Sequence, residues 1–135
     1  MRIISGKFKT RLIKTPSNDS IRPTSDRARE MIFNTLNSLL IKEKKKITGQ
    51  AIIDFFCGTG ALGIEALSRG AEQVTFIDSS NESINLCRKN CQELKIIQNV
   101  KIVKLDIIKD EFPKFKDTFD LFFCDPPYQK YSLEL

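Results

Sequence analysis

The sequence contains no histidine, no pair of cysteines spaced C-x-x-C and no long uncharged apolar run. Without histidine, the chain can form neither a Ser-His nor a Cys-His catalytic pair. The cysteine spacing also argues against a zinc site, so we expect no metal and interpret the four cysteines as small buried hydrophobic residues. No stretch is suited to crossing a membrane, and the first residues lack the apolar core of a signal peptide, which predicts a cytoplasmic location without membrane association. Any chemistry must depend on carboxylates, backbone groups, aromatic rings or a cofactor.

Positive charge is concentrated in the first third of the chain. Residues 1–46 contain twelve Lys/Arg and four Asp/Glu, a net charge of +8, whereas residues 47–135 contain ten and thirteen, a net charge of −3. A basic front on a mildly acidic body predicts an anionic partner, most simply a nucleic acid. A solvated basic surface is the alternative interpretation. The length of 135 residues fits one domain with a small core.

The stretch from Ile52 to Gly63 reads I-I-D-F-F-C-G-T-G-A-L-G. Its apolar start, interrupted by Asp54, predicts a strand buried on both faces, and the glycine turn that follows leads into a helix. Such a turn lets a ligand approach bare backbone near the positive end of a helix. The glycines also spell G-x-G-x-x-G, which fits a dinucleotide site, although a turn that only connects a strand to a helix is the alternative.

The chain before this stretch predicts a basic extension followed by a helix. Residues 2–4 and 11–13 are expected to pair as a hairpin within residues 1–20. Thr24 or Ser25 is the predicted N-cap of the next helix. The apolar spacing predicts a buried stripe on this helix at Ala28, Ile32, Leu36, Leu39 and Leu40.

The chain from residue 51 predicts strands that alternate with helices. The expected strands are 51–56, 73–78, 100–105 and 119–124. The expected helices are 61–69, a helix opened by a capping box of Ser79 and Glu82 that ends near Leu94, and a short helix within 107–117. This order predicts an α/β fold, a parallel Rossmann-like sheet with helices on both faces, over residues 21–135.

Acidic residues follow the predicted strands at their carboxyl ends, where parallel sheets bind ligands. Asp78 lies twenty residues after Gly58, the position of a ribose-binding acid, and a carboxylate can accept both ribose hydroxyls. Asp106, after the next strand, could accept a hydrogen bond from an adenine amino group. Either acid could instead be an exposed strand terminus without a ligand.

The last predicted strand ends in Asp125-Pro126-Pro127-Tyr128. Two prolines fix the backbone and remove two N–H donors, so the carbonyls there stay free to accept. A carboxylate beside such a carbonyl can hold an exocyclic amine by both hydrogens, while Tyr128 stacks on the base that carries it. This arrangement favours attack of the amine nitrogen on an electrophilic methyl group through orientation and local electrostatics. A proline-rich strand exit with a packed tyrosine is the alternative.

These motifs together resemble a known family. D-F-F-C-G-T-G, followed by Asp78 and by D-P-P-Y, resembles the class I S-adenosylmethionine-dependent methyltransferases that modify exocyclic amines. R-I-I-S-G, R-P-T-S-D-R-A-R-E and G-A-L-G-I-E-A-L-S-R-G-A are similar to the bacterial 16S ribosomal RNA guanine methyltransferases of the RsmD type. The resemblance runs from Arg2 to Tyr128.

The resemblance implies a role for each motif. The methionine end of S-adenosylmethionine would contact Asp54, Cys57, Gly58 and Gly60. The ribose would be held by Asp78, and the adenine by Asp106 and Ile107. The target guanine amine would be held by Asp125, Pro126, Pro127 and Tyr128. The RNA would contact the basic extension and the start of the following helix at Lys7, Lys9, Arg11, Arg22, Arg27 and Arg29.

The implied substrate is one guanine of 16S ribosomal RNA within a partly assembled small subunit. The family would continue beyond Leu135 with a helix, a fifth strand and a closing hairpin, so we expect strand four to be an edge that promotes self-association. Three other functions stay open at this point: a DNA adenine amino-methyltransferase, an NAD-dependent oxidoreductase, and an RNA-binding fragment of the same fold without activity.

Overall fold

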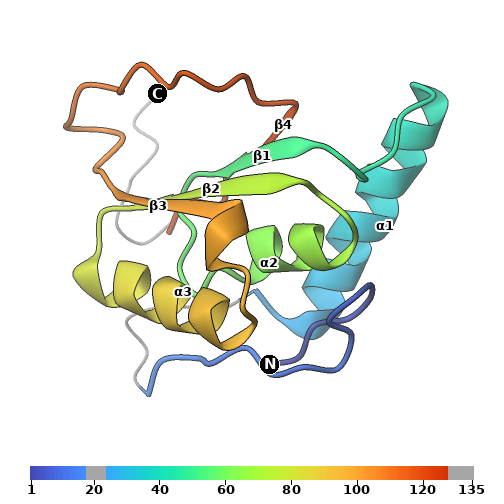
Figure 1. Cartoon of the computed structure of the whole chain (residues 1–135), viewed down its shortest axis with the longest axis horizontal. Helices are drawn as coiled ribbons and strands as arrows, with labels where there is room; N and C mark the ends of the chain where they lie inside the picture. Colours follow the sequence, from blue (N-terminus) through green and yellow to red (C-terminus); the bar gives the residue numbers. More distant parts are fainter. Residues whose placement is uncertain (18–23, 128–135) are drawn as a thin grey trace.

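The computed structural model describes residues 1–17 and 24–127 (Figure 1). Within these residues the helices are α1 (Asp26–Lys42), α2 (Ala61–Ser68) and α3 (Asn81–Glu93), with a 3-10 turn, η1, at Ile97–Asn99. The strands are β1 (Ala51–Asp54), β2 (Gln73–Asp78), β3 (Val100–Lys104) and β4 (Leu121–Phe123). The predicted order of strands and helices is confirmed, apart from the helix expected within 107–117.

The four strands form one parallel sheet in the order β3-β2-β1-β4. β1 is central, and its Asp54 lies beside Phe76 of β2 and Phe123 of β4. The chain after each strand therefore leaves from the same edge of the sheet. This confirms the predicted parallel α/β sheet and places the ends of β1, β2 and β4 next to one another.

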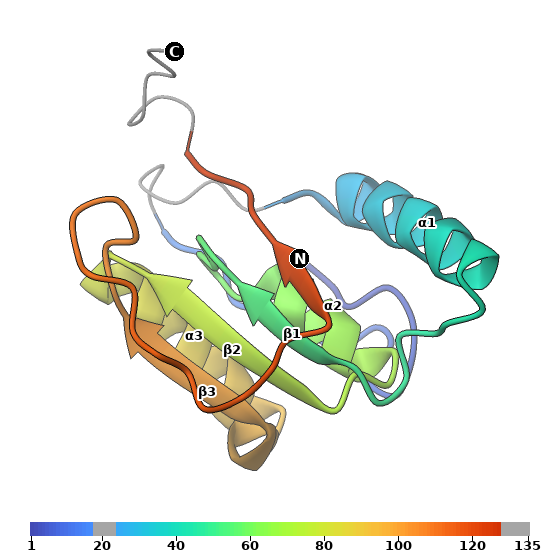
Figure 2. The same ribbon diagram turned by 90° about the horizontal axis from the view of Figure 1, so that it is seen from above.

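The two faces of the sheet are covered differently. α2 and α3 lie on one face, while the segment between β3 and β4 passes over the other (Figures 1 and 2). On that second face, Phe55 packs against Phe112 and Phe122, with ring centroids 5.8 and 6.2 Å away. The prediction of a helix in this segment is wrong, because Asp106 Oδ1 accepts from the N–H groups of Ile108 and Lys109 and forms a turn instead. For the same reason the prediction of helices on both faces of the sheet is wrong within the described residues.

The basic extension packs onto the same core. Ile3 donates its N–H to the Arg11 carbonyl at 2.9 Å, and Ile13 donates to the Met1 carbonyl at the same distance, which confirms the predicted hairpin. Both isoleucines are buried in the core cluster that also contains the helix-facing residues of the sheet. Gly6 permits this docking, because it has a φ of +89° and a Cβ there would lie 1.9 Å from the Ser68 carbonyl oxygen.

α1 differs from its predicted packing. Ser25 caps it by accepting from the Ala28 N–H at 3.1 Å, as predicted. Its fully buried residues are Arg29 and Phe33, whereas Leu39, expected in the buried stripe, is 54% exposed. The helix reaches the sheet through Phe33, whose ring lies 5.7 Å from that of Phe123. The predicted apolar stripe is therefore wrong at Leu39, whereas Ile32, Leu36 and Leu40 are partly buried against the core as predicted.

Buried charges lie beside the apolar contacts beneath α1. The Arg29 guanidinium donates to Glu65 Oε1 at 3.4 Å, and both side chains are fully buried. Glu65 also accepts from the Ile4 N–H at 2.8 Å and from Arg69 at 2.9 Å. These partners satisfy charges that would otherwise be costly to bury. The network joins the extension, α1 and α2.

Candidate functional site

The chain turns sharply after β1 to enter α2. The N–H groups of Phe56 and Cys57 both donate to the Ile77 carbonyl, at 3.2 and 2.9 Å. Phe56 has a φ of 76°, a conformation that costs a non-glycine residue on the order of 1–2 kcal/mol. Gly60, the N-cap of α2, has a φ of +87°, and a Cβ there would lie 2.8 Å from Cys87 Sγ. Gly60 therefore has the positive φ that the sequence predicts for the glycine turn, and its lack of a side chain leaves room for Cys87.

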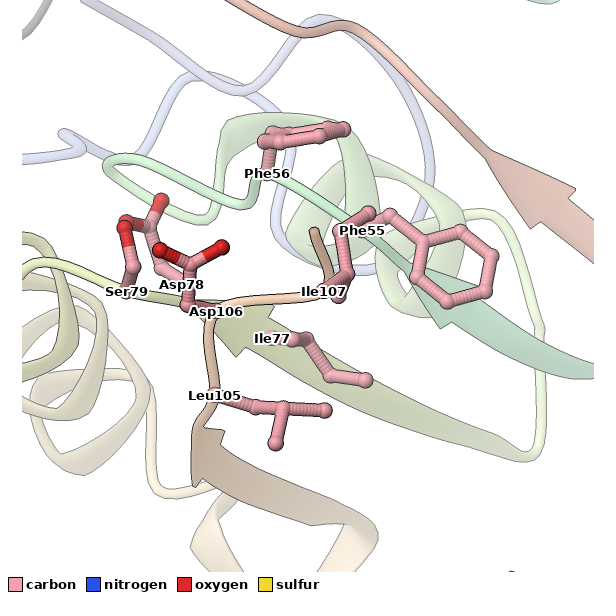
Figure 3. Close-up of a pocket in the computed structure, with 8 residues that line it drawn as sticks. All are labelled: Phe55, Phe56, Ile77, Asp78, Ser79, Leu105, Asp106 and Ile107. Atoms are coloured by element: carbon pink, nitrogen blue, oxygen red, sulfur yellow. The ribbon is translucent and has the colours of Figure 1, made fainter. Parts of the chain in front are cut away.

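A first cleft lies between the ends of β2 and β3 (Figure 3). It is lined by the predicted acids Asp78 and Asp106, by Ile107, and by Phe55, Phe56, Ile77, Ser79 and Leu105. Asp78 Oδ2 accepts from the Gly58 N–H, and Oδ1 accepts from the Ser80 N–H, each at 3.0 Å. Asp78 therefore fixes the glycine turn and the start of α3 while its carboxylate lines the cleft. The N-cap of α3 is Ser80 rather than the predicted Ser79.

A second cleft lies between the ends of β1 and β4. It is lined by Asp54, Cys57, Gly58 and Asp125 from the predicted site, and by Thr24, Phe56, Thr59, Ala61 and Leu62. Phe56 lines both clefts, which therefore adjoin at this residue. The structure thus brings all the predicted cofactor residues except Gly60 to two adjoining clefts around a single turn; Gly60 lines neither cleft and faces Cys87 and Ile64.

Asp54 is the most perturbed acid of this second cleft. Its side chain is 2% exposed, and its Oδ2 has no hydrogen-bond partner among the described residues. Burial raises the pKa of Asp54 from 3.8 to about 7, helped by the negative charges of Asp78 and Asp125 and opposed by a hydrogen bond from the Gly63 N–H. A buried carboxylate oxygen without a donor suits a ligand that brings a donor or a positive charge.

Asp125 lies exposed at the mouth of the same cleft. The Thr24 hydroxyl, just before α1, donates to Asp125 Oδ2 at 3.5 Å. Pro126 and Pro127 follow without secondary structure, and Tyr128 lies outside the described residues. The predicted amine-holding carboxylate therefore faces the turn that carries the predicted cofactor residues.

Among the lining residues that sequence reasoning did not assign to the site, Thr24 and Phe56 have contacts or a conformation that the sequence did not predict. Thr24 was predicted only as a helix cap, yet it reaches Asp125 across 101 positions of sequence. Phe56 was predicted only as a strand residue, and no local pattern indicates its positive φ. The R-P-T segment was the available signal for Thr24.

The predicted RNA-contacting residues divide into two groups. Lys7, Lys9 and Arg11 are exposed on the hairpin and Arg27 on α1, whereas Arg22 lies outside the described residues. Lys7 and Arg11 flank the Phe8 ring at 5.5 and 5.9 Å. The prediction that Arg29 is exposed is wrong, because it is fully buried and paired with Glu65.

Three cysteines confirm their predicted burial and one does not. Cys57, Cys87 and Cys91 are buried beneath the turn, whereas Cys124 is exposed after β4. The hydrogen bonds of Cys87 with Cys57 and Cys91, together with burial, raise its pKa. Across residues 1–17 and 24–127, no group of three His, Cys, Asp or Glu side chains is placed to hold a metal ion. In the same residues, no helix is long and apolar enough to cross a membrane.

The chain is similar to several known bacterial proteins. YlbH of Bacillus subtilis is 34% identical over 136 residues, which cover 99% of this chain and 70% of YlbH. Two proteins named ribosomal RNA small subunit methyltransferase D are also 34% identical to this chain. The match with the Haemophilus influenzae protein covers 95% of this chain and 64% of that protein. The match with the Escherichia coli K12 protein covers 99% of this chain and 63% of that protein. The chain thus spans less than two thirds of these two relatives.

Solved structures support the same relationship. The Haemophilus influenzae protein HI0767, described as a methylase, is 33% identical, with a TM-score of 0.64 over 93% of this chain and 64% of that one. The Thermus thermophilus protein TTHA0928 is 26% identical, with a TM-score of 0.63 over 80% and 57%. The Rossmann-like class I methyltransferase fold expected from the sequence is thereby confirmed. The family described as Conserved hypothetical protein 95 matches residues 1–134, and this chain belongs to it.

Proposed function

We propose that this chain carries the cofactor site and the amine-holding motif of an S-adenosylmethionine-dependent methyltransferase that modifies one guanine of 16S ribosomal RNA. The observation that carries the proposal is the second cleft, where Asp54, the glycine turn and Asp125 meet. The names of the two methyltransferase D relatives support ribosomal RNA of the small subunit as the substrate. The fold alone would leave the substrate open.

The residues of the two clefts fit the cofactor. In this proposal the Asp78 carboxylate accepts from the ribose hydroxyls, and Asp106 and Ile107 contact the adenine in the first cleft. Asp54, Cys57, Gly58 and Gly60 contact the methionine end in the second. That end carries an ammonium and a sulfonium, and the unpartnered Asp54 Oδ2 supplies the acceptor that such cations require. When bound, the cofactor supplies an electrophilic methyl group on sulfur.

The target amine would enter from the side of Asp125. Its exposed carboxylate accepts an amine N–H, while Pro126 and Pro127 hold the backbone beside it in a fixed conformation. Tyr128, outside the described residues, is proposed to stack on the guanine. These groups orient the nitrogen toward the methyl group, and their contribution to the rate is orientation and electrostatic stabilisation. The Thr24 hydroxyl would keep the Asp125 carboxylate turned toward the cleft.

The exposed basic residues of the hairpin and α1 would bind the RNA backbone. Lys7, Lys9, Arg11 and Arg27 are proposed as phosphate contacts, together with Arg22 outside the described residues. A small-subunit assembly intermediate in the cytoplasm is the proposed substrate particle. We also propose that the chain self-associates through β4, because β4 is an edge of the described sheet; a monodisperse monomer in light scattering would contradict this.

Calorimetric titration with S-adenosylmethionine, with NAD as the control ligand, tests the cofactor assignment. Binding of the former alone is expected, and binding of NAD alone would indicate the oxidoreductase alternative. Transfer of a labelled methyl group is then measured with naked 16S ribosomal RNA, small-subunit particles and DNA. Labelling of DNA instead of RNA would replace the proposed substrate, and salt-sensitive RNA binding without any transfer would identify an inactive RNA-binding fragment.

A further inference from the structure

A single buried amide on α3 bridges the two functional regions. Asn90 is 1% exposed. Its Nδ2 donates to the carbonyl oxygens of Lys14, at 3.1 Å, and Thr59, at 3.0 Å, and its Oδ1 accepts from the Lys14 N–H at 2.8 Å. Both amide hydrogens and the amide oxygen are therefore used, all on main-chain groups.

The two partners of Asn90 belong to different parts of the molecule. Thr59 lies in the glycine turn, lines the second cleft, and accepts the Ala61 N–H at its hydroxyl at 3.3 Å. Lys14 follows the basic hairpin and lies along α3, where its side chain pairs with Glu93 at 2.6 Å. Asn90 is thus a direct link between the glycine turn, which lines the proposed cofactor cleft, and the backbone that follows the basic hairpin.

We infer that Asn90 is a positioning residue that holds the basic N-terminal segment and the glycine turn in register, so that each segment's order depends on the other. This inference rests on the proposed function for what the two segments bind. If Asn90 served only stability, it would make the same three hydrogen bonds, and its substitution would lower the free energy of unfolding without changing ligand affinity in the folded protein. A positioning asparagine also changes the affinity of the folded protein for both ligands.

The link makes cofactor binding and RNA binding reciprocal. A ligand that orders the turn at Thr59 restrains the Asn90 amide, and the amide restrains the backbone of Lys14. By linkage, RNA bound to the hairpin then raises cofactor affinity by the same factor by which the cofactor raises RNA affinity. Substitution of Asn90 removes that factor.

Asn90→Asp tests the inference with an isosteric change. The variant keeps an acceptor for the Lys14 N–H and replaces the donor with an oxygen that faces two carbonyls. We expect its affinities for S-adenosylmethionine and for 16S ribosomal RNA each to fall about tenfold, with calorimetric stoichiometry unchanged. Asn99→Asp, the same change at an exposed position, is the control. The calorimetric stoichiometry reports the fraction of folded protein. If the variant binds with a lower stoichiometry but with unchanged affinity, Asn90 has a purely structural role and the inference is overturned.

Hydrogen exchange of the unaltered chain gives a second measurement if the variant does not fold. Addition of S-adenosylmethionine is expected to slow exchange of the Lys14 amide, which donates to Asn90. The Glu72 amide, which donates to the Gln50 carbonyl at 2.9 Å at the opposite end of the sheet, should not change. Equal behaviour of the two amides would overturn the inference. If the unaltered chain binds no S-adenosylmethionine, the proposed function itself fails and the inference falls with it.

Discussion

Asp54→Asn is expected to stabilise the folded chain at alkaline pH, although Asp54 lies in the proposed cofactor site. Burial raises the pKa of this carboxyl from 3.8 to about 7, so the folded protein resists its ionisation. Between these values the folded state binds a proton that the unfolded state releases, and stability falls as the pH rises. Above the folded pKa the full cost of the buried charge is present. Asparagine removes this charge and keeps an acceptor for the Gly63 N–H.

The magnitude follows from the shift. A difference of about three pKa units at about 1.4 kcal/mol per unit gives a cost of about 4 kcal/mol, an order-of-magnitude figure. Proton linkage with these two pKa values makes the destabilisation by the Asp54 carboxyl about 4 kcal/mol at pH about 8.5 and about 2 kcal/mol at pH about 5. The advantage of Asp54→Asn over the original chain should therefore shrink by about half between these conditions.

Urea denaturation at the two pH values measures this difference, with Glu72→Gln as an exposed carboxylate-to-amide control. The control should change stability by less than about 0.5 kcal/mol at either pH. A gain for Asp54→Asn that is equal at both pH values, or a loss at the higher one, would refute the reasoning. The variant should also lose affinity for S-adenosylmethionine, because its amide no longer offers a charged acceptor.

Three further substitutions test other parts of the structure. Asp125→Ala should abolish methyl transfer in the labelling assay while calorimetry shows nearly unchanged cofactor binding; full transfer would contradict the proposed amine contact. Arg29→Met should lower the free energy of unfolding by up to about 3–5 kcal/mol, because it removes one of the two arginines that pair with the buried Glu65 carboxylate. The exposed Arg27→Met should change stability little and weaken RNA binding, and equal stability of the two variants would contradict the buried network. Gly63→Ala should cost at least about 1–3 kcal/mol in thermal or urea unfolding, because its Cβ would lie 2.3 Å from the Phe76 ring, and a neutral result would mean that the ring can move aside.

Much of the site could be predicted because its signals are local in sequence. The strand Gln73–Asp78 has the bounds expected from its apolar run and its terminal acid. Once the strands are parallel, their carboxyl ends must meet at one edge, which brings Asp54, Asp78 and Asp125 toward the same turn. Glycine spacing after the first strand was sufficient to predict the turn itself.

The residues that were missed depend on distant partners. Arg29 is buried because Glu65, 36 positions later, supplies its counter-charge, and a helical pattern treats any arginine as exposed. Thr24 belongs to the site only because its segment crosses to Asp125. The short helix expected within 107–117 fails because the Asp106 side chain satisfies the backbone N–H groups locally. The outcomes at Arg29 and Thr24 are not encoded in a window of neighbouring residues, whereas the turn at Asp106 is local and was missed because a side-chain acceptor competes with the helix.

The position of β4 has a consequence for the order in which the chain folds. β1, α2 and β2 are consecutive, whereas β4 docks on β1 across 69 positions, where Asp120 accepts the Ala51 N–H at 2.8 Å. Closing that longer loop costs more entropy, and contacts of high sequence separation form more slowly. The half of the site built on β1 and β2 can therefore assemble before Asp125 arrives. Under the proposed function, a newly made chain would bind S-adenosylmethionine before its Asp125 could hold a target amine.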